Sequence, residues 1–155
     1  MHYLIDGYNL IGSSPSISLE DSSKEEKLVD WLINNNHGKK HRFTVVFDGH
    51  GNPDFLCSRR VKCEVYIIFT SESESADYYI EMKLRSAKQL SSILLVSSDK
   101  EIIQVAKECI INYLTSKEFI AHFLSQKQYQ KVEKPAEFTD YEYWADQFLE
   151  ERTKA

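Results

Sequence analysis

The stretch His2-Tyr-Leu-Ile-Asp6-Gly-Tyr-Asn9 decides the fold class, because a short apolar run here ends in an acid and a glycine. The run from His2 to Ile5 is typical of a buried strand, and further strands are predicted over residues 43–48, 61–69, 92–97 and 110–114. Segments with helical spacing separate these strands. Since parallel neighbours need long crossovers, the alternation predicts an α/β fold with a mostly parallel central sheet and helices on both faces.

The helices are predicted from capping patterns and apolar spacing. Ser23-Lys-Glu-Glu26 and Ser98-Asp-Lys-Glu101 both have the spacing of a capping box, in which a serine and a glutamate satisfy backbone donors at a helix start. Further helices are predicted over residues 76–88, 117–128 and 141–151. Gly7 is expected to make a sharp turn, and an irregular loop is expected over residues 12–16.

Composition narrows the class of protein. The chain has 155 residues, which fits one domain over residues 1–130, followed by a linker and a closing helix over 131–155. A net charge of −5 argues against tight nucleic-acid binding through a broad basic face. The 3 cysteines lack C-x-x-C spacing, so neither a disulfide-linked partner nor a zinc site is expected. No apolar run approaches the length of a membrane helix, and a cytoplasmic protein is expected.

Aspartates stand where strands are predicted to end. Asp6 and Asp48 close the first two strands, whereas Asp77 and Asp99 lie in the first turns of the helices after the third and fourth. In an open α/β sheet, ligands bind outside the carboxyl ends of the strands, so these acids are expected to share one pocket. Neighbouring carboxylates raise each other's pKa, and a hard divalent cation with oxygen ligands relieves that repulsion.

Two interpretations of these acids stay open. Asp77 and Asp99 also suit helix starts, because an acid there caps free amides and complements the helix dipole. A pocket of shared carboxylates can instead hold divalent ions that activate water for phosphodiester hydrolysis, which is nuclease chemistry. Mg²⁺ or Mn²⁺ fits such oxygen ligands better than zinc does. The amide of Asn9 is expected to orient a water, a phosphate or the Asp6 carboxylate.

The order and spacing of four segments resemble a known family over about residues 1–115. The segments are Asp6-Gly-Tyr-Asn-Leu-Ile11, Val45-Val-Phe-Asp48, Glu74-Ser-Ala-Asp77-Tyr-Tyr-Ile80 and Ser97-Ser-Asp99. They are similar to the NYN domain family in its YacP-like branch. The resemblance implies a PIN-like, Rossmann-like three-layer fold and a metal-dependent endoribonuclease. One relative in that branch is a ribosome-associated enzyme that cuts messenger RNA during translation, so mRNA and the ribosome are implied as partners.

The resemblance also implies roles for individual residues. It makes Asp6, Asp77 and Asp99 the central metal-binding carboxylates, with Asn9 as the polar residue beside them. Asp48 matches the acid that ends the second strand.

Other positions match the family less closely. Glu74 corresponds to an acidic loop position that reaches a metal through water, although Glu72 is placed almost as well. The segment Gly49-His-Gly-Asn52 is not a family pattern, and Tyr78 stands where a second acid is common, which puts a second metal in doubt.

Contacts with RNA are expected at the rim of the acidic pocket. Arg59 and Arg60 follow the loop after Asp48 and are the better candidates, because the basic run at residues 39–42 precedes a strand and falls at the opposite edge. Tyr8 is expected either to stack on a base or to pack against the sheet.

The leading hypothesis is therefore an Mg²⁺- or Mn²⁺-dependent endoribonuclease that cleaves single-stranded RNA. The alternative is a non-cleaving RNA- or ribosome-binding module with a degenerate acidic site. A phosphatase or receiver domain is disfavoured, because Asp6-Gly-Tyr-Asn9 lacks the neighbouring pattern of a phosphoacceptor aspartate.

Overall fold

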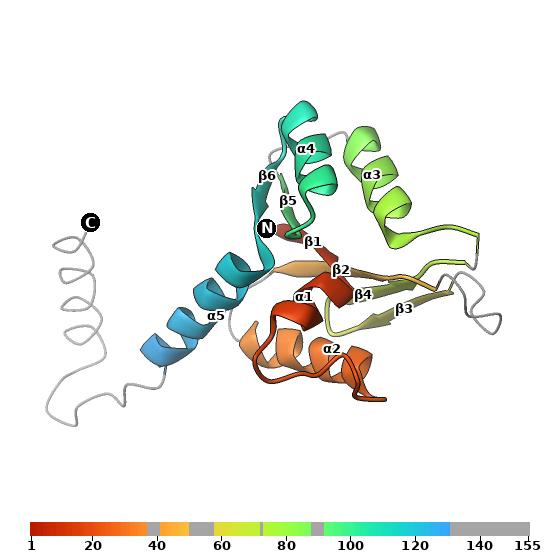
Figure 1. Cartoon of the computed structure of the whole chain (residues 1–155). Helices are drawn as coiled ribbons and strands as arrows, with labels where there is room; N and C mark the ends of the chain where they lie inside the picture. The colour runs from red at the N-terminus through yellow and green to blue at the C-terminus, as the bar shows by residue number, and fades with distance from the viewer. Residues whose placement is uncertain (37–40, 50–57, 72, 88–91, 131–155) are drawn as a thin grey trace, which may run out of the picture. The chain divides into compact units, whose positions relative to one another are not determined.

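The computed structural model describes residues 1–36, 41–49, 58–71, 73–87 and 92–130, with side chains left out at 58–60 and 125–130. Met1–Phe123 form one compact unit, shown with its helices and strands in Figure 1. A second unit spans Leu124–Ala155, and only its first helical residues belong to the described part. The helix predicted over residues 141–151 lies outside it.

A six-stranded sheet in the order β3-β4-β2-β1-β5-β6 forms the centre of the first unit. Its neighbours are parallel except for the antiparallel pair β3 and β4. The strands are β1 (His2–Asp6), β2 (Arg42–Phe47), β3 (Ser58–Lys62), β4 (Val65–Phe69), β5 (Ile93–Val96) and β6 (Asn112–Leu114). The predicted α/β class with a mostly parallel sheet is confirmed.

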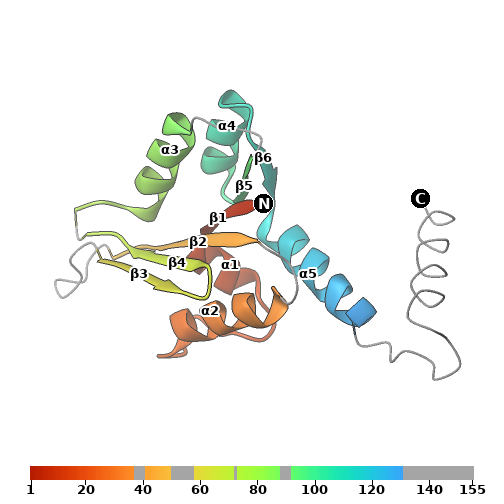
Figure 2. The same cartoon turned by 180° about the vertical axis from the view of Figure 1, so that it is seen from behind.

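Helices cover both faces of this sheet, as Figures 1 and 2 show. The helices are α1 (Gly7–Ser13), α2 (Lys24–Asn35), α3 (Ala76–Ser86), α4 (Lys100–Glu108) and α5 (Ser116–Gln130). One buried cluster joins the sheet to α1, α2 and the first part of α5, and a second joins it to α3 and α4. The result is the three-layer arrangement expected from the sequence.

The alternation of β1 explains how one strand serves both cores. Successive side chains of a strand point to opposite faces, and Tyr3 and Ile5 lie in one buried cluster whereas Leu4 lies in the other. Phe119 and Phe123 of α5 join the first cluster, with ring centroids 4.6 Å apart. Each fully buried aromatic or aliphatic side chain contributes about 1.5–3 kcal/mol. The site at the end of β1 therefore rests on a strand fixed from both sides.

The single strand predicted over residues 61–69 is wrong, because the chain turns back within it. β3 and β4 form a hairpin whose turn residues, Cys63 and Glu64, have φ of 47° and 66°. A two-residue hairpin of this handedness usually has Gly, Asn or Asp at these positions. The turn thus uses two residues that carry no such signal.

The sharp turn expected at Gly7 is also wrong, since α1 begins directly after β1. A Cβ on Gly7 would lie 2.5 Å from two ring carbons of Phe47. Glycine is needed here for close approach of α1 to β2, and the irregular loop expected from residue 12 begins only after Ser13.

The two capping boxes predict the helix starts but not their hydrogen bonds. Ser23 is the N-cap of α2, yet its side chain makes no capping bond. At α4 the cap is Asp99 rather than Ser98, and its Oδ1 accepts a 2.8 Å bond from the Glu101 amide. The interpretation of Asp99 as a residue that caps free helix amides is therefore confirmed.

Two further observations concern the described residues. None of their helices is long and apolar enough to cross a membrane. Cys63 and Cys109 are free thiols, whereas Cys57 lies outside the described residues.

Candidate active site

Asp6 is the buried centre of an acidic group at the carboxyl ends of the strands. It is the last residue of β1 and is only 8% exposed. Its pKa is raised to about 6, first by burial and then by the Asp77 carboxylate, while the backbone N–H of Asn9 opposes the rise. The charges of Asp99 and Asp48 raise it further. Its charged form is thus disfavoured by every nearby acid.

Asp77 lies in the first turn of α3, which Ser75 caps by accepting a 3.1 Å bond from the Tyr78 amide. The pKa of Asp77 is also raised, first by partial burial and then by Asp99. Asp48 and Glu101 add to this rise. The aspartates predicted to share one edge therefore lie within electrostatic range of one another, together with a glutamate that was interpreted from the sequence only as a capping residue.

Asp48 follows the end of β2, and the chain is anchored just beyond it. The Gly49 amide donates a 3.0 Å hydrogen bond to Thr70 Oγ1, which follows β4 and is fully buried. This bond holds the end of β2 against the end of β4. The half-buried Asp48 is thereby fixed at the same edge as Asp6.

The side chain of Asn9 connects three elements. Its Oδ1 accepts a 2.9 Å bond from the Ser98 amide and a 2.7 Å bond from the hydroxyl of Ser116. The Ser116 amide in turn donates a 3.0 Å bond to Ser98 Oγ. The expected partners of the Asn9 side chain were a water, a phosphate or Asp6, whereas its oxygen instead holds the turn that carries Asp99.

Ser116 was missed by the sequence interpretation. It is fully buried at the start of α5, 107 residues from its partner Asn9. No local pattern in the sequence joins the two positions. The only signal is weak, since a serine at a helix start is common for capping alone.

The predicted RNA contacts have mixed outcomes. Tyr8 packs on Phe47 with ring centroids 5.1 Å apart, and its hydroxyl donates a 2.8 Å bond to Glu25. Packing against the sheet is thus observed, and stacking on a base stays a prediction. Arg59 and Arg60 belong to β3, whose first residue pairs with the last residue of β4, so their backbone starts from the acidic edge. Their side chains lie outside the described part.

Glu74, the remaining predicted metal residue, lies in the turn before α3, where its amide donates a 3.2 Å bond to the Ser71 carbonyl. Its alternative, Glu72, lies outside the described residues. The part of Glu74 in a site stays a prediction.

The donor chemistry of this edge suits a hard divalent ion, because every candidate ligand is a carboxylate oxygen. Within the described ranges, however, no three His, Cys, Asp or Glu side chains already form a group that could hold a metal. Asp77 lies in the first turn of α3, where its residue is exposed although its carboxylate is partly desolvated. The residues fit such an ion in type and charge.

Comparison with known proteins follows this geometry. The sequence profile of the YacP-like NYN domain matches residues 3–155. The uncharacterized protein YacP of Bacillus subtilis (strain 168) is 31% identical over 99 residues, which is 61% of this chain and 58% of that relative. This match therefore spans less than two thirds of the relative's length.

Two solved structures share the fold. A crystal structure of Rae1 (YacP) from Bacillus subtilis superposes with a TM-score of 0.64 at 21% identity, covering 99% of this chain and 90% of that one. A mutant form of the same protein gives 0.60 at 23% identity, with 84% and 85% covered. The family is nuclease-like, which supports a nuclease or RNA-related role. With its profile matched over nearly the whole length and its acids gathered at one edge of the sheet, this chain belongs to the YacP-like NYN domain family.

Proposed function

We propose that this protein is a divalent-metal-dependent endoribonuclease that cleaves single-stranded RNA. The observation that carries the proposal is Asp6, a buried acid whose pKa is raised to about 6 by burial and by neighbouring carboxylates. Such a group is unfavourable in a structure that needs only stability, because repulsion between buried like charges is costly. Its presence in a nuclease-like family favours a catalytic role.

The chain's own residues would divide the work. Asp6, Asp77 and Asp99 would hold the ion, with Asp48 and Glu74 further out. Mg²⁺, or Mn²⁺, would polarise the phosphodiester and lower the pKa of the attacking water. Asp6 supplies a fixed oxygen from a strand end, whereas Asp99 is oriented by its cap at α4 and by the bonds that Asn9 makes to the same turn.

Substrate and location form the finer part of the proposal. Arg59 and Arg60 would attract the RNA backbone toward the acidic edge, and Tyr8 would stack on a base once its ring is uncovered. Messenger RNA on the ribosome is the proposed natural substrate, in the cytoplasm. The membership of the chain in a nuclease-like family supports the RNA part of this assignment.

The test is cleavage of a short end-labelled RNA by the purified full-length chain, with Mg²⁺, with Mn²⁺ and with a chelator. Asp6→Asn and Asp77→Asn should each reduce the cleavage rate by on the order of 10²-fold or more. Asp30→Asn is the matched control, because Asp30 pairs with Lys62 at 3.1 Å on the exposed surface. The proposal would be refuted if wild type shows no metal-dependent cleavage of free RNA or of RNA on ribosomes. It would also be refuted if Asp6→Asn and Asp77→Asn cleave RNA as fast as wild type.

A non-cleaving RNA- or ribosome-binding module is the second candidate. It is favoured by the lack of a ready-made metal group within the described ranges and by Tyr78, which is 53% exposed where a second acid is common. This candidate predicts that the chain co-sediments with ribosomes equally well as wild type, Asp6→Asn and Asp77→Asn, and cleaves RNA under none of the metal conditions.

A further inference from the structure

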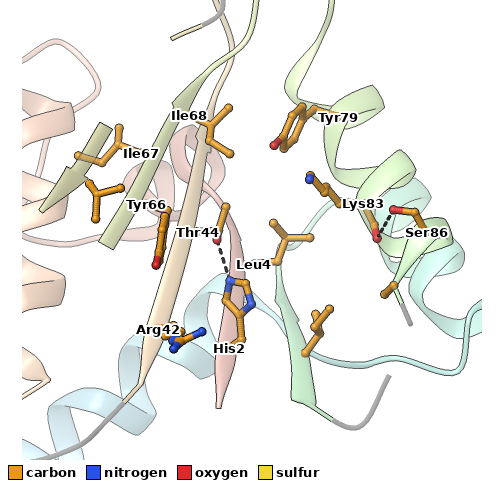
Figure 3. A pocket seen from close by; sticks show the side chains of 13 residues that line it. His2, Leu4, Arg42, Thr44, Tyr66, Ile67, Ile68, Tyr79, Lys83 and Ser86 are labelled. Atoms are coloured by element: carbon orange, nitrogen blue, oxygen red, sulfur yellow. Dashed lines mark hydrogen bonds between the residues drawn. The ribbon is translucent and has the colours of Figure 1, made fainter. Parts of the chain in front are cut away.

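A cavity of about 630 Å³ lies between α3 and the sheet, away from the acidic edge. Figure 3 shows it bounded by Tyr79, Lys83 and Ser86 of α3 on one side and by strands β1, β2 and β4 on the other. Its volume is in the range of small-molecule sites, about 300–1,000 Å³. It extends along β1 from Leu4, two residues before Asp6, to His2 at the amino end, about 13 Å from Asp6 along the strand.

The cavity is cationic although the chain is acidic. Its described lining residues include Arg42 and Lys83 and no Asp or Glu, in a chain with net charge −5. The Lys83 ammonium points into the cavity and lies 5.5 Å from the centre of the Tyr79 ring. Arg42 has one exposed ion-pair partner, Glu64, at 3.7 Å. The cavity therefore favours an anion, since among the described residues Lys83 is paired with a ring alone and Arg42 with an exposed, solvated carboxylate.

The pKa of His2 is affected by the same positive charge. Its Nε2 is 2.7 Å from Thr44 Oγ1, at the floor of the cavity. The pKa of His2 is lowered, first by burial and then by the Arg42 guanidinium. An anion bound beside Arg42 would reverse the second of these causes.

The remaining walls suit a flat polar ring more than an alkyl chain. Leu4, Ile68 and Ile93 give apolar surface, and the ring of Tyr66 is 37% exposed beside them. Thr44, Tyr66 and Ser86 add hydroxyls that hydrogen-bond in either direction. Bases stack on aromatic rings and arginine planes and also need such polar partners.

We propose that this cavity binds a single nucleotide unit, with its base against Tyr66 and its phosphate attracted by the positive charges of Lys83 and Arg42. The unit is either a free mononucleotide or one nucleotide of an RNA strand. Only the second source rests on the proposed ribonuclease function, since the cavity and its charges do not involve the acidic edge. The site is thus a binding site separate from the candidate active site.

The test is calorimetric titration of the full-length chain with AMP in the presence of a chelator, which prevents metal-mediated binding at the acidic edge. Saturable binding is expected, and adenosine or inorganic phosphate alone should bind at least about tenfold more weakly, since each lacks half of the contacts. The His2 pKa, followed by NMR, should rise on AMP binding.

Two variants locate the binding. Lys83→Gln and Arg42→Gln should each weaken AMP binding by about tenfold. Lys107→Gln is a matched control, because Lys107 lies 5.8 Å from the Tyr113 ring in the same type of contact but does not line the cavity. It should leave AMP binding unchanged. Circular dichroism should show that all three variants are folded.

Several outcomes separate this proposal from the ribonuclease proposal. Retention of AMP binding in Asp6→Asn supports the cavity whether or not that variant still cleaves RNA. Loss of AMP binding in Asp6→Asn, no AMP binding at all, or equal binding by wild type and Lys83→Gln would overturn it. If a short oligoadenylate binds more tightly than AMP, with the same dependence on Lys83, the natural ligand is one nucleotide of an RNA strand. If the oligoadenylate binds more weakly than AMP, the natural ligand is a free mononucleotide.

Discussion

The two ends of β1 offer opposite environments within one strand. Its carboxyl end holds the buried acid Asp6, whereas its amino end holds the imidazole of His2, which lines the cationic cavity. In both places the charged form is disfavoured: the pKa of Asp6 is raised and that of His2 is lowered. A cation would relieve the first end and an anion the second. The two ends of the strand thus favour ligands of opposite charge.

The first prediction tests the acidic end through the pH dependence of stability in a chelator. The folded pKa of Asp6 is about 6, above its ordinary value of 3.8, so the folded state binds this proton more tightly than the unfolded state. The free energy of unfolding should therefore fall as pH rises from about 4 to about 6, by about 3 kcal/mol. The raised pKa of Asp77 acts in the same direction.

Urea denaturation of wild type and Asp6→Asn measures this contribution as a difference between the two proteins. The stability gained by Asp6→Asn should be close to its maximum at pH 7 and should largely vanish near pH 4. A difference in stability that stays constant between pH 4 and pH 7 would show that the pKa of Asp6 is not raised in the folded protein. Saturating Mn²⁺ should raise the stability of wild type more than that of Asp6→Asn.

The second prediction concerns the packing that places the acidic end. In Gly7→Ala the new Cβ would lie 2.5 Å from the Phe47 ring and 3.0 Å from Val45 Cγ1. Because both partners are in the core, the free energy of unfolding should fall by about 1–3 kcal/mol. RNA cleavage should fall as well, since α1 carries Asn9 and directly follows Asp6.

Gly12→Ala is the matched control in the same helix. Its Cβ would meet only Leu19 Cδ1, at 3.6 Å. Alanine should therefore stabilise α1 by up to about 1 kcal/mol. Equal effects of the two substitutions in thermal unfolding would show that the approach of α1 to β2 is unimportant.

The third prediction tests Ser116 as a positioning residue for the acidic turn. Ser116→Ala removes the hydroxyl that donates to Asn9 Oδ1, which should reduce stability by about 1 kcal/mol. If the network orients Asp99, kcat should fall by about tenfold with little change in KM. Ser14→Ala, at an exposed serine pair, is the control. A variant of Ser116 that loses stability but keeps kcat would leave it a structural residue only.

The fourth prediction, the smallest, concerns the amino end. Because the folded pKa of His2 lies below its ordinary 6.5, the unfolded state binds this proton more tightly. Its contribution to stability is present above pH 6.5 and is lost as pH falls, opposite in sign to that of Asp6. Arg42→Gln should raise the His2 pKa measured by NMR, and Arg85→Gln should not. If the His2 pKa is unchanged in Arg42→Gln, the Arg42 charge does not act on the amino end of β1.

Sequence patterns predict the parts of this fold that depend on local chemistry. The buried runs of β1 and β2 are readable because apolar residues accumulate before Asp6 and Asp48. Their parallel pairing then follows from the helices between them. The position of the acids at one edge is therefore predictable without coordinates, although the distances that a metal would need are not.

Features that leave no local signal, or that depend on contacts between distant residues, are not readable in this way. The hairpin at Cys63 and Glu64 uses left-handed residues without the usual glycine, so a continuous β-rich run conceals it. Gly7 shows the converse, because a glycine that resembles a turn signal is needed for contact with Phe47. The bond from Ser116 to Asn9 spans 107 residues, and only the packing of α5 creates it.

The outer strands of the sheet have a consequence for the solution behaviour of the chain. β3 and β6 end the strand order, and an outer strand with unpaired backbone groups is a template for adding further chains. β3 reads Ser58-Arg-Arg-Val-Lys62, and β6 has only 3 residues. Basic residues and brevity both discourage such addition. Removing Arg59 and Arg60 would thus promote aggregation as well as weaken any attraction for RNA. Weaker RNA binding by such a variant can therefore be attributed to lost charge only if the variant stays monodisperse.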